Sequence, residues 1–209
     1  MSLKRLLSKE NETDWALWKV EESQDELYKL LNDSTAGPEL DQINHPQKRL
    51  EWLASRLVIK KLVENLNQEF PGIYKDAFGK PHLYQLPFHI SIAHCYPYAV
   101  GALHDSLPIG IDIEQPRDKL IRIRDRFLNN NEIKLTGNDI NLLCKFWSGK
   151  EVLYKIYGRK KLVFKENIHI DIDPSNEHQL IGRVVFGKFD KRYTIKTDYI
   201  DGHYISIGN

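Results

Sequence analysis

The sequence predicts an α+β fold in two halves, and three observations support this prediction. Two long stretches, residues 46–70 and 139–157, carry apolar residues at helical spacing. Each stretch is followed by short segments rich in β-branched and aromatic residues, which are typical of strands. The chain has 209 residues and 41% hydrophobic content, enough for one sizeable domain or two small ones. We therefore expect a first half at residues 1–104 and a second half at residues 105–209.

In the first half, the pattern predicts a strand at residues 14–20 and a short helix at residues 23–32. Pro46 opens the long helix, which should pack on a sheet, and Pro71 with Gly72 ends it. Three strands are predicted after it, at residues 82–84, 88–93 and 98–103, with prolines between them.

The same order then begins again. Residues 109–113 predict a strand and residues 119–129 a basic helical segment. Asp139 should cap the second long helix and Gly158 should end it. Further strands are predicted at residues 162–172, 180–189, 192–200 and 203–207. The halves show no detectable sequence similarity, so their common order only suggests a duplicated architecture.

Composition excludes several classes of protein. Thirty basic and 29 acidic residues leave a net charge of +1, so the chain as a whole has no general attraction to nucleic acid or to anionic membranes. No stretch approaches the roughly 18 apolar residues of a membrane span, and we expect a cytoplasmic protein. Cys95 and Cys144 lie far apart and in no metal-binding spacing, which argues against structural zinc and a disulfide framework.

The segment at residues 110–114 alternates apolar and acidic residues. In a strand, this period of two sends Ile111 and Ile113 to one face and Asp112 and Glu114 to the other. Two carboxylates about 6 to 7 Å apart along a strand can bind one cation. An isolated Asp-x-Glu is more often the wet face of an amphipathic strand, so further residues must support a metal site.

The second long helix supplies that support. Trp147, Glu151 and Lys155 lie nearly opposite its apolar stripe. Glu151 and Lys155 alone could be an exposed pair worth about 0.2 to 0.5 kcal/mol, but an indole one turn earlier indicates that a ligand or another element covers this face. Mg²⁺ prefers carboxylate oxygens and keeps waters and substrate phosphates as other ligands. We predict one metal site from Asp112, Glu114 and Glu151, with Lys155 beside it to neutralise phosphate charge.

Further phosphate-binding candidates lie upstream, each with a plainer alternative. Lys75 and Lys80 belong to a turn whose glycine lets the backbone approach a ligand, or to a simple solvated turn. His94 ends a predicted strand, although a lone histidine is more often structural or superficial. Arg49 and Arg56 share one face of the first long helix, where a solvated surface is the default interpretation.

Taken in order, four motifs resemble the 4'-phosphopantetheinyl transferase superfamily. They are FGKP at residues 78–81, ISIAH at 90–94, GIDIE at 110–114 and FWSGKEVLYK at 146–155. The family patterns are GKP, a strand ending in SH, G(I/V)D(I/V)E and W-(S/T)-x-KE-x-x-x-K, and the last two are strongly diagnostic together. The segments WLASR at 52–56 and RFL to Glu132 at 126–132 extend the resemblance to residues 46–165. Ala93 stands where the family has serine, and the residues after His94 lack the family's usual glycine.

This resemblance implies the long, single-chain type of the fold, with two pseudo-symmetric α/β halves, each a small, mainly antiparallel sheet packed on a long helix. It implies a Mg²⁺-dependent enzyme that transfers the 4'-phosphopantetheine arm of coenzyme A to a serine of an apo acyl or peptidyl carrier protein and releases 3',5'-ADP. We expect a monomer, without nucleic-acid or membrane partners.

The resemblance also assigns roles by position. Coenzyme A would bind between the halves, the first half serving its nucleotide and the second half the metal and the carrier protein. Asp112, Glu114 and Glu151 would ligate Mg²⁺, Glu151 would act as general base directly or through a metal-bound water, and Lys155 would assist the departing nucleotide. The expected contacts to coenzyme A are Lys75, Lys80, His94, Cys95, Asp112 and Lys155, and we add Arg49 and Arg56.

Two clusters of basic residues could receive an acidic carrier protein by long-range attraction. They are Arg122, Arg124 and Arg126, and Arg159, Lys160 and Lys161. A solvated surface is the alternative, and charge reversal at Arg122 and Arg124 that left the KM for the carrier unchanged at low salt would exclude docking there.

Two other functions remain open from the sequence. One is a non-catalytic module that binds coenzyme A or a carrier protein, and the other is a Mg²⁺-dependent phosphohydrolase that uses the same carboxylates. The first predicts coenzyme A binding without turnover, and the second predicts phosphate release without any acceptor.

Overall fold

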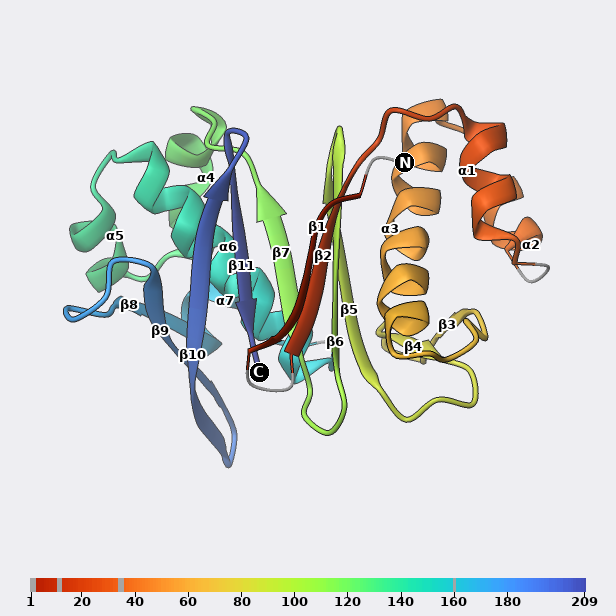
Figure 1. Cartoon of the computed structure of the whole chain (residues 1–209). Coiled ribbons are helices and arrows are strands. Elements are labelled where there is room, and N and C mark those ends of the chain that lie inside the picture. The colour runs from red at the N-terminus through yellow and green to blue at the C-terminus, as the bar shows by residue number, and fades with distance from the viewer. Residues whose placement is uncertain (1–2, 11–12, 34–35, 160) are drawn as a thin grey trace. The chain divides into compact units, whose positions relative to one another are not determined.

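The structure, a computed structural model, describes residues 3–10, 13–33, 36–159 and 161–209 (Figure 1). The chain separates into two compact units, Met1–Leu107 and Pro108–Asn209. Each unit contains an antiparallel sheet with a long helix packed against it, which confirms the predicted α+β class.

The first unit is built on a six-stranded sheet in the order β1-β2-β6-β5-β4-β3. Its long helix α3 packs against β2, β5 and β6 and buries Leu53, Leu57 and Leu62 completely. The elements of this unit are β1 (Leu3–Glu10), β2 (Thr13–Lys19), α1 (Gln24–Leu31), α2 (Gly37–Asp41), α3 (Pro46–Asn65), β3 (Ile73–Lys75), β4 (Pro81–Leu83), β5 (His89–Cys95) and β6 (Tyr98–His104).

The helices of this unit begin and end where local chemistry favours it. Ser23 caps α1 in a capping box with Glu26, and Asn32 ends that helix in the left-handed conformation. Pro46 occupies the first turn of α3, where its missing N–H leaves no hydrogen bond unmade. The predicted strand at residues 14–20 and both predicted helices are present, but α3 ends at Asn65 and not at Pro71. The strands β1 and β3 and the helix α2 were not predicted.

The second unit is built on a five-stranded sheet in the order β7-β11-β10-β9-β8. Its long helix α6 packs against β7, β11, β8 and β9, with Phe146 and Leu153 completely buried. The elements of this unit are β7 (Gly110–Glu114), α4 (Lys119–Phe127), α5 (Asn130–Thr136), α6 (Ile140–Tyr157), α7 (Phe164–Asn167), β8 (Ile168–Ile172), β9 (Gln179–Phe186), β10 (Phe189–Ile200) and β11 (His203–Gly208).

The two units share one topology. In the first, β2 is followed by α3 and then by four strands, and the sheet order is β2-β6-β5-β4-β3. In the second, β7 is followed by α6 and then by four strands in the equivalent order β7-β11-β10-β9-β8. The strand β1 is an addition at the edge of the first sheet. The duplicated architecture that the sequence suggested is thus present in the order of strands, without detectable sequence similarity.

The strand predicted at residues 162–172 was wrong in its first part. The segment Phe164–Asn167 is one helical turn, and the strand begins only at Ile168. Asn167 stabilises the turn because its side chain accepts the backbone N–H of Val163 at 2.8 Å and donates to the carbonyl of Val185 at 3.0 Å. Such side-chain to backbone hydrogen bonds compete with strand pairing, which aromatic and β-branched content alone does not reveal.

Candidate functional site

The strand β7 presents both of its carboxylates to α6. Lys155 of α6 donates to Asp112 Oδ1 at 2.8 Å, and Trp147 of α6 donates from its indole N–H to Glu114 Oε1 at 2.8 Å. Ile111 and Ile113, which are buried, alternate with them along the strand. The predicted alternation of this strand is therefore observed.

A glycine at position 110 lets this strand lie close to the helix. A Cβ atom at Gly110 would stand 2.3 Å from the carbonyl oxygen of Val152 and 3.1 Å from a side-chain carbon of Ile156. Any larger residue would push β7 away from α6. The glycine that opens the GIDIE segment is thus a condition for bringing Asp112 and Glu114 to the helix.

The helix α6 aligns its functional side chains in one row. Asp139 caps its start by accepting the backbone N–H groups of Asn141 and Leu142, and Gly158 ends it in the left-handed conformation. Trp147, Glu151 and Lys155 then follow at four-residue intervals on one face.

Hydrogen bonds from two side chains fix this row against β7. Trp147 reaches Glu114, and Lys155 reaches both Asp112 Oδ1 and the carbonyl of Ile111, each at 2.8 Å. Glu151 lies in the row between these two anchors, so three carboxylates and one ammonium group gather within the second unit.

The carboxylates of this cluster disfavour one another's charge. Burial raises the pKa of Glu151 to about 7, and the negative charges of Asp112 and Glu114 add to the effect against the opposing influence of Lys155. Burial also raises the pKa of Glu114, with a further contribution from Asp112 that the hydrogen bond from Trp147 partly offsets. A cation placed among these groups would relieve both effects.

The chemistry of the donor set fits a hard divalent cation. Asp112 Oδ2 is buried and accepts no hydrogen bond in the part of the chain that the structure describes. Within the described residues, no group of three or more His, Cys, Asp or Glu side chains forms a ready-made metal site. Mg²⁺ commonly takes only one or two direct carboxylate ligands and completes its shell with waters and substrate phosphates. The cluster is therefore suited to a cation that a phosphate substrate helps to bind.

Other protein elements cover Trp147. Its ring packs edge-on against Phe127 at 5.0 Å and tilted against Phe164 at 5.6 Å, measured between ring centroids. Of the two explanations that the sequence left open for an indole on this face, ligand or second element, the structure supports the second. The ring packing and the hydrogen bond to Glu114 together hold the indole in place.

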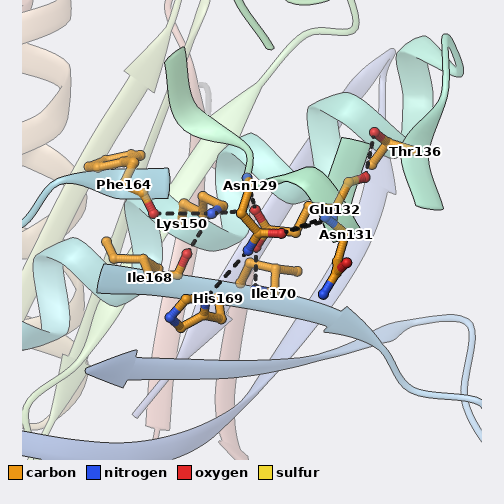
Figure 2. A network of polar contacts seen from close by, with 9 residues as sticks. All are labelled: Asn129, Asn131, Glu132, Thr136, Lys150, Phe164, Ile168, His169 and Ile170. Carbon is orange, nitrogen blue, oxygen red and sulfur yellow. Dashed lines mark hydrogen bonds and ion pairs between the residues drawn. The ribbon is translucent and has the colours of Figure 1, made fainter. Parts of the chain in front are cut away.

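Next to Glu151, Lys150 enters a buried network that sequence reasoning missed (Figure 2). Its ammonium group, with no exposed surface, pairs with Glu132 Oε2 at 2.8 Å and donates to the carbonyls of Ile168 and Phe164. The other carboxylate oxygen of Glu132 accepts the backbone N–H of Ile170 at 2.8 Å. Lys150 and Glu132 thereby connect α6, α5, α7 and β8, and so fix the helix that carries Glu151.

In the first unit, Lys75 and Lys80 lie at the two ends of a tight turn. Asp76 organises it, because its Oδ1 accepts the backbone N–H groups of Phe78 and Lys80 at 2.8 and 2.9 Å. Gly79 takes the positive φ of +85° that the turn requires. Lys75 is exposed and Lys80 half-buried, and burial lowers the pKa of Lys80 against the attraction of Asp76.

His94 and Cys95 follow each other on β5 and therefore point to opposite faces of the sheet. His94 Nδ1 lies 3.3 Å from Glu51 Oε2, and Glu51 belongs to α3. His94 is thus on the helix face. Cys95 is half-buried and pairs across the hairpin with Tyr98.

Contacts within the first unit account for Arg49 and Arg56 without a ligand. Arg49 donates to the side chain of Gln24 and to the carbonyls of Leu40 and Ile43. Arg56 is buried, stacks on the Trp52 ring 3.3 Å from its centroid and pairs with Glu39 at 2.7 Å. Burial lowers the pKa of Arg56 to about 10. Both side chains hold α1 and α2 onto α3, and their contact to coenzyme A stays a prediction.

The basic clusters of the second unit differ in accessibility. Arg122 and Arg126 are exposed on α4, whereas Arg124 donates to the carbonyl of Gly137 and to the side chain of Asn138. Arg159 and Lys161 are exposed, and Lys160 lies outside the described residues.

No helix in the described residues is both long enough and apolar enough to cross a membrane.

The family profile described as the 4'-phosphopantetheinyl transferase superfamily matches residues 108–207. Over 148 residues the chain is 34% identical to the 4'-phosphopantetheinyl transferase ffp of Bacillus subtilis, a stretch covering 66% of each protein. Over 126 residues it is 28% identical to the 4'-phosphopantetheinyl transferase gsp of Aneurinibacillus migulanus, covering 57% of this chain and 52% of the relative. The chain therefore spans about half to two thirds of the length of these relatives.

Proposed function

Because the chain belongs to the 4'-phosphopantetheinyl transferase superfamily, we propose that it transfers the 4'-phosphopantetheine arm of coenzyme A to a serine of an apo acyl or peptidyl carrier protein. The observation that carries this proposal is the cluster of Asp112, Glu114 and Glu151 beside Lys155. A set of carboxylates whose charges repel one another, next to an ammonium group, suits a cation and a phosphate substrate.

In the proposed reaction, the serine oxygen of the carrier protein forms a bond to the β-phosphorus of coenzyme A. The anhydride bond to the α-phosphate breaks, and 3',5'-ADP leaves with the electron pair. Glu151 is the candidate that takes the serine proton, directly or through an intervening water, because its carboxylate lies in the same cluster as Asp112 and Lys155. Lys155, held by Asp112, contributes positive charge close to the departing phosphates.

The same residues would hold Mg²⁺. Asp112, Glu114 and Glu151 are its candidate ligands, and Asp112 Oδ2 is the buried oxygen that accepts no hydrogen bond from the described residues. Bound there, Mg²⁺ would neutralise the pyrophosphate of coenzyme A and favour cleavage of the anhydride.

The nucleotide and phosphates of coenzyme A are assigned in this proposal to the first unit. Lys75 and Lys80 offer two ammonium groups from an ordered turn, and His94 offers an imidazole. Cys95 lies on the face of β5 opposite to His94, so its proposed contact to coenzyme A requires that the ligand also reach that face.

The acidic carrier protein would dock on the exposed basic residues of the second unit. Arg122 and Arg126 on α4 are the accessible members of the first cluster, and Arg124 is already engaged in local contacts. Long-range attraction of this kind raises the association rate at low salt.

Mass spectrometry of a carrier-protein reaction tests the function. The purified chain is incubated with coenzyme A, Mg²⁺ and a panel of apo carrier proteins, and we expect the mass of the arm to appear on an acceptor. Glu151→Gln should abolish the addition, whereas Glu177→Gln, which alters a side chain that is 87% exposed, should not. No addition to any carrier would overturn the proposal.

The same assay separates the alternatives. Coenzyme A binding without turnover would indicate a binding module, and phosphate release without an acceptor would indicate a phosphohydrolase. The proposal also includes a monomeric, cytoplasmic enzyme, which sedimentation and cell fractionation would test.

A further inference from the structure

Glu51 is a buried carboxylate that holds three side chains at once. Its side chain is 4% exposed. Oε1 accepts a hydrogen bond from Gln47 at 2.9 Å, and Oε2 lies 2.6 Å from Lys48 Nζ and 3.3 Å from His94 Nδ1. Gln47 and Lys48 come from the preceding turn of α3, whereas His94 comes from β5.

These contacts keep the carboxylate ionised. Burial by itself would raise the pKa of Glu51, but the hydrogen bonds from Lys48 and Gln47 and the charge of His94 outweigh it and leave the pKa below its usual value. A buried carboxylate is costly to maintain unless its partners are well placed, and an apolar residue at this position would pack α3 on the sheet without that cost. The carboxylate therefore calls for a role beyond packing.

The pairing fixes the orientation of His94. A carboxylate at Nδ1 selects one ring orientation and stabilises the imidazolium form, in which both ring nitrogens donate hydrogen bonds. The side chain of His94 is 38% exposed while its partner Glu51 is almost completely buried. The arrangement therefore holds the exposed ring of His94 by a carboxylate that is itself buried.

We propose that Glu51 is a positioning residue that holds His94 as a cationic donor for a phosphate group of coenzyme A. This inference rests on the proposed function, because coenzyme A is the anionic ligand that function requires. Glu51 itself does not touch the ligand and acts through the imidazole.

A second pair on α3 shows what a purely local contact looks like. Lys61 and Glu64 form an ion pair at 2.5 Å with the same spacing of three residues, but the Glu64 side chain is 39% exposed. Glu64→Gln is therefore a matched control for Glu51→Gln, since both remove one carboxylate that pairs with a lysine of the same helix.

Calorimetric titration with coenzyme A at pH 7.5 tests the proposal. We expect Glu51→Gln to weaken binding about tenfold, His94→Asn to weaken it by a similar factor, and the double variant to be no worse than His94→Asn. At this pH an imidazole without its carboxylate is mostly neutral, so His94 with glutamine at position 51 has the same net charge of zero as the ion pair of Glu51 and His94. The loss of affinity then reports the loss of the cationic donor and not a change in the total charge of the pair. Glu64→Gln should leave the affinity unchanged. Additive losses, or no loss in Glu51→Gln, would overturn the positioning role.

Two further measurements separate this inference from its premise. In steady-state assays, Glu51→Gln should raise the KM for coenzyme A about tenfold and keep kcat within about twofold, a division that general destabilisation does not produce. Nitrogen NMR of the free protein should show a doubly protonated His94 ring that becomes singly protonated in Glu51→Gln. Unchanged ring signals would overturn the positioning role, whereas a wild-type protein without any affinity for coenzyme A would overturn the proposed function.

Discussion

Replacing Glu151 by glutamine should stabilise the fold of the metal-free protein at pH 8. The same replacement should abolish transfer in the assay that contains Mg²⁺. The pKa of Glu151 rises from an ordinary 4.5 to about 7, because of burial and the charges of Asp112 and Glu114. At about 1.4 kcal/mol for each pKa unit, this difference corresponds to at most about 3 to 4 kcal/mol. Partial exposure of the side chain makes about 1 to 2 kcal/mol the realistic range.

The direction in which stability changes with pH follows from the number of protons bound in the folded and unfolded states. The folded protein holds a proton on Glu151 up to about pH 7, whereas the unfolded chain releases it near pH 4.5. The folded state is therefore destabilised progressively as the pH rises from about 4.5 to about 7, and the full cost remains above that range. Glutamine cannot ionise, so the variant escapes this cost at pH 8 and gains nothing from it at pH 4.

Urea unfolding followed by far-UV circular dichroism, in the presence of a chelator, measures the effect. The transition midpoint of Glu151→Gln should exceed that of the wild type at pH 8 and match it at pH 4, and Glu177→Gln should match the wild type at both. Mg²⁺ at pH 8 should then stabilise the wild type more than the variant. An equal gain at both pH values, or no gain at pH 8, would refute the raised pKa of Glu151 that burial and the neighbouring carboxylates cause.

Three other substitutions probe the supports of the site. Lys150→Met leaves Glu132 as an uncompensated buried charge and should lower the free energy of unfolding by about 3 to 5 kcal/mol, and adding Glu132→Gln should restore part of it in the same urea titration. Gly110→Ala forces a Cβ against a backbone carbonyl of α6 and should lower the free energy of unfolding by about 1 to 3 kcal/mol. It should also weaken Mg²⁺ binding measured by calorimetry, and an unchanged affinity would contradict the required close approach of β7 to α6. Trp147→Phe keeps the ring packing but removes the donor to Glu114, so the pKa of Glu114 should rise further and Mg²⁺ binding at pH 7 should weaken by about 1 kcal/mol. If Trp147→Phe and the wild type bound Mg²⁺ with the same affinity at pH 7 and also at pH 8.5, the hydrogen bond from Trp147 would not support the metal site.

The sequence was most informative where local chemistry decides the structure. Asp139 and Gly158 mark the ends of α6 because a side-chain oxygen and a left-handed glycine satisfy the terminal backbone groups there. The spacing of Trp147, Glu151 and Lys155 and the alternation of β7 depend only on helix and strand periods. Both could be read without knowledge of the tertiary structure.

What the sequence could not predict depends on contacts between distant residues. Lys150 finds Glu132 eighteen positions earlier, and a lysine in a polar motif gives no signal that its ammonium group is buried. Glu51 meets His94 only because α3 packs on β5. Arg56 looked accessible on a helix face, but α2, which has no strong periodic pattern, supplies the Glu39 that binds it.

The burial of Lys150 has a consequence for chemical labelling. Its amine has no exposed surface and is surrounded by the oxygens of Glu132, Phe164 and Ile168. An amine-directed reagent can reach it only while α6 separates from α5 and β8, whereas the exposed lysines of the chain react at once. The rate at which Lys150 is modified therefore reports how often this part of the protein opens, and it measures the local stability of the helix that carries Glu151.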